Sequence, residues 1–152
     1  MRKAFSMITA IFIILLMASV GAFIMNLSGK MVKGTTTQFQ HEQSVLLAKS
    51  YTEYAIMAVT ANDHTNSGCL NNLSGAYAPD GIHTIYTVDV NLSYIGNSAI
   101  DGSCRTLSNG VVHPNSPLNV IIDVYVRYPE LDHPLGTNAP QVTYHKRSLQ
   151  KI

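Results

Sequence analysis

Two cysteines, Cys69 and Cys104, are the residues of this 152-residue chain whose type and spacing point most directly to a covalent chemistry. Neither belongs to a Cys-x-x-Cys motif, and there is no second cysteine pair that would complete a zinc site. Both follow a long apolar run, and a domain exported by such a run meets an oxidising compartment, where thiols pair. We therefore predict a disulfide between them, which would restrict the unfolded chain by about 4 kcal/mol in the loop-entropy model.

Other residues capable of chemistry lack the spacing that catalysis or metal binding requires. The histidines show no His-x-His or His-x-x-x-His pattern and are expected to be solvated or structural: His41, His64, His83, His113, His133 and His145. Glu130, Asp132 and Asn138 could supply oxygen ligands to calcium, but their irregular spacing favours a solvated turn. The chain also lacks Gly-x-Ser-x-Gly, Walker and Gly-x-Gly-x-x-Gly motifs. We predict a protein that is not an enzyme and uses no metal or cofactor.

Charge argues against a nucleic-acid partner. Charged residues make up 12% of the chain, and the formal net charge is +1. Without Arg2 and Lys3, the ten basic residues fall to eight against nine acidic ones, so an exported part would be close to neutral. A nucleic-acid-binding domain would be expected to carry a basic excess. The length that follows the apolar run, about 120 residues, suits one modest domain.

The apolar run near the N-terminus predicts a membrane-spanning helix. Residues 5–27 contain no charged side chain and are apolar apart from four small polar residues. About twenty residues at 1.5 Å each match the hydrocarbon core of a bilayer. Basic residues flank the run on both sides, with Arg2 and Lys3 before it and Lys30 and Lys33 after it, so charge leaves its orientation open.

Residues 28–64 are predicted to continue as an amphipathic helix. The part after Gly34 contains no Gly or Pro as far as Asp63. Apolar positions at spacings of three and four would form one stripe on this helix: Leu47, Tyr51, Tyr54, Ala58 and Ala61. Gly34 and the threonines that follow it are poor helix formers, so we expect a softer joint between the apolar and amphipathic segments. Asn, Asp, Ser and Gly accumulate after Asn62 and predict the end of the helix.

The remainder, residues 65–152, carries the alternating pattern of half-buried strands. Apolar and polar side chains alternate over residues 86–94 and again over residues 118–126. A further candidate strand covers residues 142–147. About three strands with a face of Val, Ile and Tyr predict a small antiparallel sheet, for which the helical stripe is the only adequate cover. The expected fold class is α+β, with helix 35–64 and the sheet forming one soluble unit.

The extreme N-terminus carries a recognisable arrangement of residues. A short basic leader, MRKA, ends in a small residue and is followed by Phe5 and the uninterrupted apolar segment FSMITAIFIILLM. This arrangement resembles the type IV pilin-like superfamily, which includes minor pilins and the pseudopilins of type II secretion. The resemblance implies that residues 1–4 are a leader, that a prepilin peptidase cuts between Ala4 and Phe5, and that the new amino group of Phe5 is methylated. The long helix, the sheet and the cysteine pair agree with the plan of that family.

Two residues depart from the family pattern. Ala4 stands where Gly is usual before the cut, and Thr9 stands where Glu is usual at the fifth mature position. The family implies that this Glu meets the N-terminal amine of a neighbouring subunit, because an unpaired carboxylate inside a membrane is costly. Thr9 carries no charge for such a pair. A major pilin would be expected to keep the carboxylate, so the expected assembly residues, Phe5 and Thr9, favour a minor or tip-located subunit.

The resemblance also implies a function, partners and a location. The chain would be a non-catalytic minor pilin or pseudopilin subunit of a type IV pilus or type II secretion filament. Its partners would be other pilin-like subunits, the prepilin peptidase and an inner-membrane assembly platform. Before processing it would be a single-pass protein of the inner membrane with its C-terminal domain in the periplasm, and afterwards part of the filament.

Two other interpretations of the N-terminus stay open. Small residues directly before Phe23, in the sequence VGA, resemble a signal-peptidase site, and cleavage there would release a periplasmic or secreted binding domain. Against this, the apolar run continues through residues 23–27. The other alternative is a plain N-terminal membrane anchor that carries a small binding domain in the periplasm.

Overall fold

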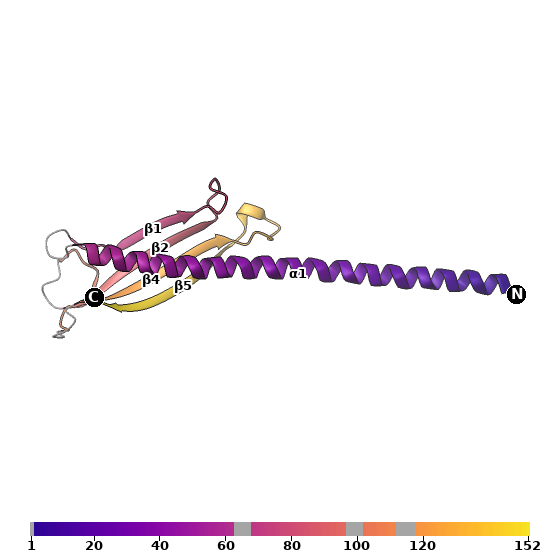
Figure 1. The fold of residues 1–152 in the computed structure, drawn as a ribbon, viewed down its shortest axis with the longest axis horizontal. Helices are drawn as coiled ribbons and strands as arrows, with labels where there is room; N and C mark the ends of the chain where they lie inside the picture. The colour runs from indigo at the N-terminus through magenta and orange to yellow at the C-terminus, as the bar shows by residue number, and fades with distance from the viewer. Residues whose placement is uncertain (1, 63–67, 97–101, 112–117) are drawn as a thin grey trace. The chain divides into compact units, whose positions relative to one another are not determined.

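The fold combines one long helix with a sheet, as Figure 1 shows. The computed structural model describes residues 2–62, 68–96, 102–111 and 118–152, the side chains of residues 2–6 and of Thr137 excepted. The described elements follow in the order α1 (Arg2–Ala61), β1 (Asn72–Tyr77), β2 (Tyr86–Gly96), β3 (Thr106–Ser108), β4 (Leu118–Pro129), η1 (Gly136–Asn138) and β5 (Gln141–Lys151). The predicted α+β class is confirmed, with five strands in the described part of the chain where the sequence indicated about three.

The first compact unit, Met1–Phe39, consists of the N-terminal part of α1. The helix continues without a break through Gly34 and the threonines, where we expected a softer joint. The hydroxyls of Thr35, Thr36 and Thr37 each donate a hydrogen bond to a carbonyl three or four residues earlier, at 2.8, 3.1 and 3.0 Å. These bonds satisfy the hydroxyls within the helix, which persists despite the low helix propensity of these residues.

The second unit, Gln40–Ile152, is built on a sheet with the strand order β1-β2-β4-β5. Neighbouring strands on this path are antiparallel, whereas β3 pairs with the end of β2 in parallel. The segments predicted as strands, 86–94, 118–126 and 142–147, fall inside β2, β4 and β5 and are confirmed. The sequence does not reveal β1 or β3, because the alternation in β1 stops after its first three residues and β3 is only three residues long.

The two long central strands supply most of the core, because their alternating apolar side chains point to the same face. Val90 of β2 lies opposite Val124 of β4, and Leu92 lies opposite Ile122; all four side chains are fully buried. Each such side chain contributes roughly 1.5–3 kcal/mol by leaving water. The other buried hydrophobic side chains of these two strands follow the same period of two: Tyr86, Val88, Tyr94, Val120, Val126 and Tyr128.

The helical side of this core differs from the stripe that the sequence predicted. The buried helix residues of the second unit are Gln40, Ser44, Ala48, Thr52, Ala55 and Val59. Of the predicted stripe, Leu47, Tyr51 and Ala58 are half-buried, while Tyr54 and Ala61 are exposed. The prediction of the helix face that packs on the sheet is therefore wrong, because the buried face is rotated by part of a turn from the predicted stripe. Small side chains let the helix approach the sheet closely, and the larger apolar residues pack along the margins of the contact.

Polar residues occupy this helix face because their hydrogen bonds are satisfied. The Ser44 and Thr52 hydroxyls each donate to a carbonyl three or four residues earlier in the helix, both at 2.6 Å. A hydroxyl bonded to its own helix costs little to bury, so it serves as a small packing residue. Gln40 bonds across the unit instead, donating from Nε2 to the Pro129 carbonyl at 2.9 Å. This bond fastens the helix to the end of β4.

Candidate functional site

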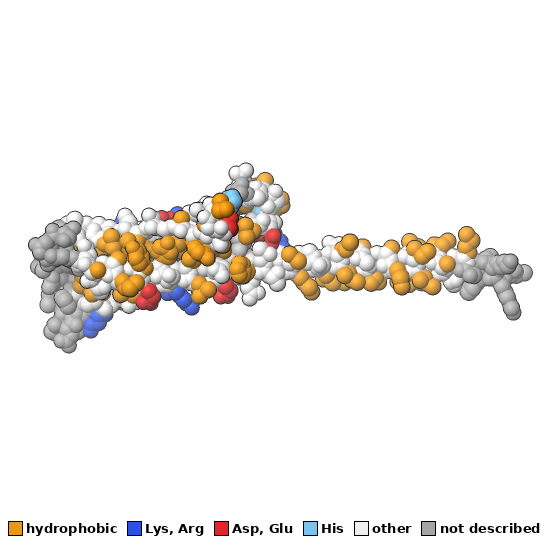
Figure 2. All heavy atoms as spheres, turned by 45° about the horizontal axis from the view of Figure 1, so that its top comes forward, with side chains coloured by type: hydrophobic (Ala, Val, Ile, Leu, Met, Phe, Trp, Pro, Cys, Tyr) orange, Lys and Arg blue, Asp and Glu red, His pale blue; other side chains and the backbone are white. Residues whose placement is uncertain are grey.

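Exposed apolar side chains are the main feature of the described N-terminal part of α1. The large apolar residues described from Met7 to Val32 are all exposed, from 41% for Leu27 to 80% for Met25. Figure 2 shows hydrophobic side chains along the length of this part of the helix. By length and composition, α1 is long and apolar enough to cross a membrane. A surface of this kind needs lipid or other apolar helices to cover it.

The residues predicted to direct processing and assembly lie at the N-terminal end of α1. Ala4 and Phe5 belong to the helix, and their side chains are outside the described ones. Thr9 follows Phe5 by four residues, and its side chain is exposed. Residues four apart share one face of a helix, so the structure brings Phe5 and Thr9 to the same face. The side chain at position 9 is a hydroxyl and carries no charge that could pair with an N-terminal amine.

Cys69 and Cys104 form the predicted disulfide, with their Cα atoms 4.8 Å apart. The bond joins the segment that follows the helix to the segment that precedes β3. The Cys69 amide donates to Ser103 Oγ at 3.2 Å, and Asn71 Nδ2 donates to the Ser103 carbonyl at 2.9 Å. The Arg105 amide donates in turn to Asn71 Oδ1 at 2.8 Å. The disulfide and these hydrogen bonds hold one end of the sheet in place. The disulfide therefore has a structural role.

The open face of the sheet, which is the face turned away from the helix, carries a cluster of charged residues. Arg147 donates from Nε and Nη2 to the two carboxylate oxygens of Asp123, at 2.7 and 2.9 Å. His145 Nε2 lies 2.8 Å from the same carboxylate, and the His145 ring stacks on Tyr125 with centroids 4.5 Å apart. Hydrogen bonding from Arg147, aided by His145, holds the pKa of the Asp123 carboxyl below its usual value although burial raises it.

The cluster around Asp123 escapes sequence analysis because its members lie on different strands. Asp123 and Arg147 are 24 residues apart and become direct neighbours only when β4 pairs with β5. The alternation over residues 118–126 places Asp123 on the face opposite the apolar side chains. That signal identifies the face, but it does not identify the partners that the register supplies.

Where the structure describes the residues considered as metal ligands, they do not form a cluster. No group of three or more His, Cys, Asp and Glu side chains within the described ranges could hold a metal ion. The three residues considered for calcium belong to the connection between β4 and β5. His64 and His113 lie outside the described residues. His83 Nδ1 is 2.7 Å from Asp80, an exposed contact that holds the pKa of the Asp80 carboxyl well below its usual range.

Comparisons with known proteins supply no relative, because no protein-family model, curated protein or solved structure matches this chain. Three features remain to indicate a function. They are the uncovered apolar part of α1, the uncharged Thr9 near its start, and the disulfide-bonded sheet unit that the same helix enters.

Proposed function

We propose that this protein is a non-catalytic, pilin-like subunit of a filament, either a minor pilin or a type II secretion pseudopilin. It spans the inner membrane once before processing, with the sheet unit in the periplasm, and enters the filament afterwards. Its partners are other pilin-like subunits, the prepilin peptidase that cuts between Ala4 and Phe5, and the inner-membrane assembly platform.

The observation that carries this proposal is that one continuous helix, α1, has both a part that packs on the sheet and a part with exposed apolar side chains. Its C-terminal part supplies buried residues such as Ala48 and Val59 to the core of the sheet unit, while its N-terminal part exposes apolar side chains. A cleaved signal peptide has no need of this continuity, because it leaves the folded domain behind. A filament subunit does need it, because the helix that leaves the lipid remains attached to the domain and packs against equivalent helices. Apolar lipid contacts are then exchanged for apolar protein contacts at little net cost.

The uncharged residue at position 9 supports a minor position in the filament. A carboxylate in an apolar helix bundle is costly unless a cation meets it, so a subunit with a repeated neighbour benefits from a complementary charge pair. Thr9 neither incurs that cost nor forms that pair. A subunit present in few copies, or at the tip with no subunit above it, can assemble without the pair.

Mass spectrometry of the N-terminal peptide of the protein isolated from its host tests the proposal. We expect a chain that begins with N-methylated Phe5. A chain that begins at Phe23 would contradict the filament proposal and support a periplasmic or secreted binding domain released by signal peptidase. A chain that retains residues 1–4 in a host with an active prepilin peptidase would also contradict it, in favour of a plain membrane anchor.

A further inference from the structure

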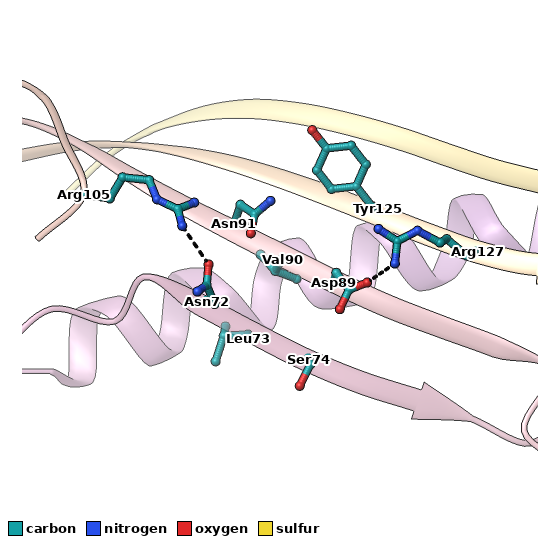
Figure 3. A pocket seen from close by; sticks show the side chains of 9 residues that line it. All are labelled: Asn72, Leu73, Ser74, Asp89, Val90, Asn91, Arg105, Tyr125 and Arg127. Atoms are coloured by element: carbon teal, nitrogen blue, oxygen red, sulfur yellow. Dashed lines mark hydrogen bonds and ion pairs between the residues drawn. The ribbon is translucent and has the colours of Figure 1, made fainter.

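A groove on the open face of the sheet has no part in the proposed helix assembly. It is an open groove with a volume of about 520 Å³, between β1, β2, β4 and the segment that precedes β3. Figure 3 shows the side chains that line it. Its polar and aromatic lining includes Asn72, Asp89, Asn91, Arg105, Tyr125 and Arg127. A groove with this lining suits a hydrated, polar ligand, since cavities for apolar molecules are lined predominantly by hydrophobic side chains.

Strand pairing brings the neutral groups of the groove together. Asn72 of β1 lies directly opposite Asn91 of β2, so two carboxamides are adjacent on the open face. Tyr125 of β4 lies opposite Asp89 of β2, and the Tyr125 ring stacks on His145 with an interplanar angle of 11°. This stacking fixes the orientation of the ring beside the groove. The amides offer donors and acceptors in pairs, and the tyrosine offers an aromatic surface with a hydroxyl.

The two arginines of the groove differ in their partners. Arg127 forms an ion pair with Asp89, so these two charges offset each other. Arg105 donates from Nη2 to the neutral Oδ1 of Asn72 at 3.3 Å, and no carboxylate of the described chain forms an ion pair with its guanidinium. The groove therefore has a net positive charge at its Arg105 end. The other N–H groups of that guanidinium are suited to an anionic oxygen.

We propose that this groove binds a short acidic oligosaccharide. Arg105 receives a sugar carboxylate through charge-assisted hydrogen bonds, Asn72 and Asn91 bond to ring hydroxyls, and Tyr125 packs against a sugar ring. The charge of Arg105 separates acidic saccharides from neutral ones of the same size. All of these residues belong to the sheet unit, so the site does not depend on how the N-terminus is processed.

Isothermal titration calorimetry of the full chain with tri-galacturonate tests this site. The protein is held in micelles of octaethylene glycol monododecyl ether, which contains neither sugar nor charge. We expect saturable binding that weakens when NaCl is raised from about 0.05 to about 0.5 M, because salt screens an exposed charge. Arg105→Gln should weaken the affinity about tenfold or more, the size expected for a lost charge-assisted contact. Lys151→Gln removes one exposed positive charge outside the groove and should change the affinity less than about twofold.

Two further probes separate the ligand classes. Maltotriose, a neutral trisaccharide, should bind at least about tenfold more weakly than tri-galacturonate, since it has no carboxylate for Arg105. Absence of saturable binding by tri-galacturonate, or equal affinity of the native chain and Arg105→Gln, would overturn the proposal. Equal affinity for tri-glutamate would also overturn it, by identifying an acidic-peptide site. None of these results bears on cleavage at Phe5, so the filament proposal stands or fails separately.

Discussion

Gly75 of β1 lies so close to Tyr51 of α1 that a side chain on the glycine would collide with the tyrosine. A Cβ atom at Gly75 would be 1.9 Å from the Tyr51 hydroxyl oxygen and 2.6 Å from Tyr51 Cζ. Gly75 is not among the glycines with a positive φ angle, so its backbone conformation would accept other residues. The position of the Tyr51 ring over β1 therefore requires glycine here.

Gly75→Ala should lower the free energy of unfolding by about 1–3 kcal/mol, because the Tyr51 ring must move to admit the methyl group. Urea unfolding of the full chain in nonionic micelles measures the change. Tyrosine fluorescence is a suitable signal, since the chain has eight tyrosines and no tryptophan.

The control for this prediction is Gly102→Ala, whose added Cβ would meet no atom within 4 Å. It should change the free energy of unfolding by less than about 0.5 kcal/mol. A second comparison places Gly75→Ala in a Tyr51→Ala background, where the cost of the methyl group should almost vanish. An equal cost in both backgrounds would show that Tyr51 is not the cause.

The helix face that packs on the sheet can be identified by two matched substitutions. Ala55 is fully buried, whereas Ala61, which belongs to the stripe predicted from the sequence, is exposed. Ala55→Leu should destabilise the sheet unit by about 1–3 kcal/mol through overpacking. Ala61→Leu should change its stability by less than about 0.5 kcal/mol. The same urea titration measures both variants. A larger destabilisation by Ala61→Leu than by Ala55→Leu would show that the stripe predicted from the sequence is the face that packs on the sheet.

The parts of this fold that follow from the sequence are those with a strong local pattern. The period of two over residues 86–94 and 118–126 reveals β2 and β4, because apolar side chains must share one face. The helix face does not follow, because Ser44 and Thr52 count as polar until their hydroxyls are seen to bond within the helix. Strand β1 does not follow either, since its Gly75 is required by a residue of a distant element.

The candidate functional features divide in the same way. The disulfide is predictable because only two cysteines exist to pair. The open-face groove is not, because Arg105 and Asn72 are 33 residues apart and Asn72 meets Asn91 only through the register of β1 and β2. Long-range register is set by the whole sheet, and no local pattern encodes it.

Acid should destabilise the sheet unit partly through Asp123. Its pKa is lowered in the folded protein, chiefly by hydrogen bonding from Arg147, so the folded state stays ionised to lower pH than the unfolded chain. The stabilising contribution is complete above the unfolded pKa of about 4 and is lost as pH falls through the lower folded value. Asp123→Asn should therefore cost about 1.5–3 kcal/mol at neutral pH and flatten the decline in stability below about pH 4.

Urea midpoints measured at a series of pH values give this result directly. Asp132→Asn is the matched control, because Asp132 is an exposed aspartate in the connection after β4. Its effect at neutral pH should stay below about 0.5 kcal/mol. An unchanged acid decline in Asp123→Asn would show that the contacts with Arg147 and His145 do not stabilise the folded state.

Substitution at Ala4 should reveal the processing site. A bulky residue, as in Ala4→Trp, should prevent cleavage before Phe5 and leave the longer precursor in the membrane. Ala10→Trp introduces the same side chain beyond the proposed cut and should be processed normally. Immunoblots of membrane fractions distinguish the two chain lengths. Normal processing of Ala4→Trp would place the cut elsewhere.

Substitution at Thr9 tests the proposed position in the filament. If the protein is a minor or tip subunit, a carboxylate at position 9 has no regularly repeated amine to meet, so Thr9→Glu should not increase the number of subunits per filament. Thr9→Val, which keeps the shape and removes the hydroxyl, should be incorporated as the native chain is. Immunogold labelling of sheared filaments, with quantitative mass spectrometry, measures both variants. Labelling of Thr9→Glu along the whole filament would contradict the minor position, because it would mean that the missing charge alone had limited incorporation.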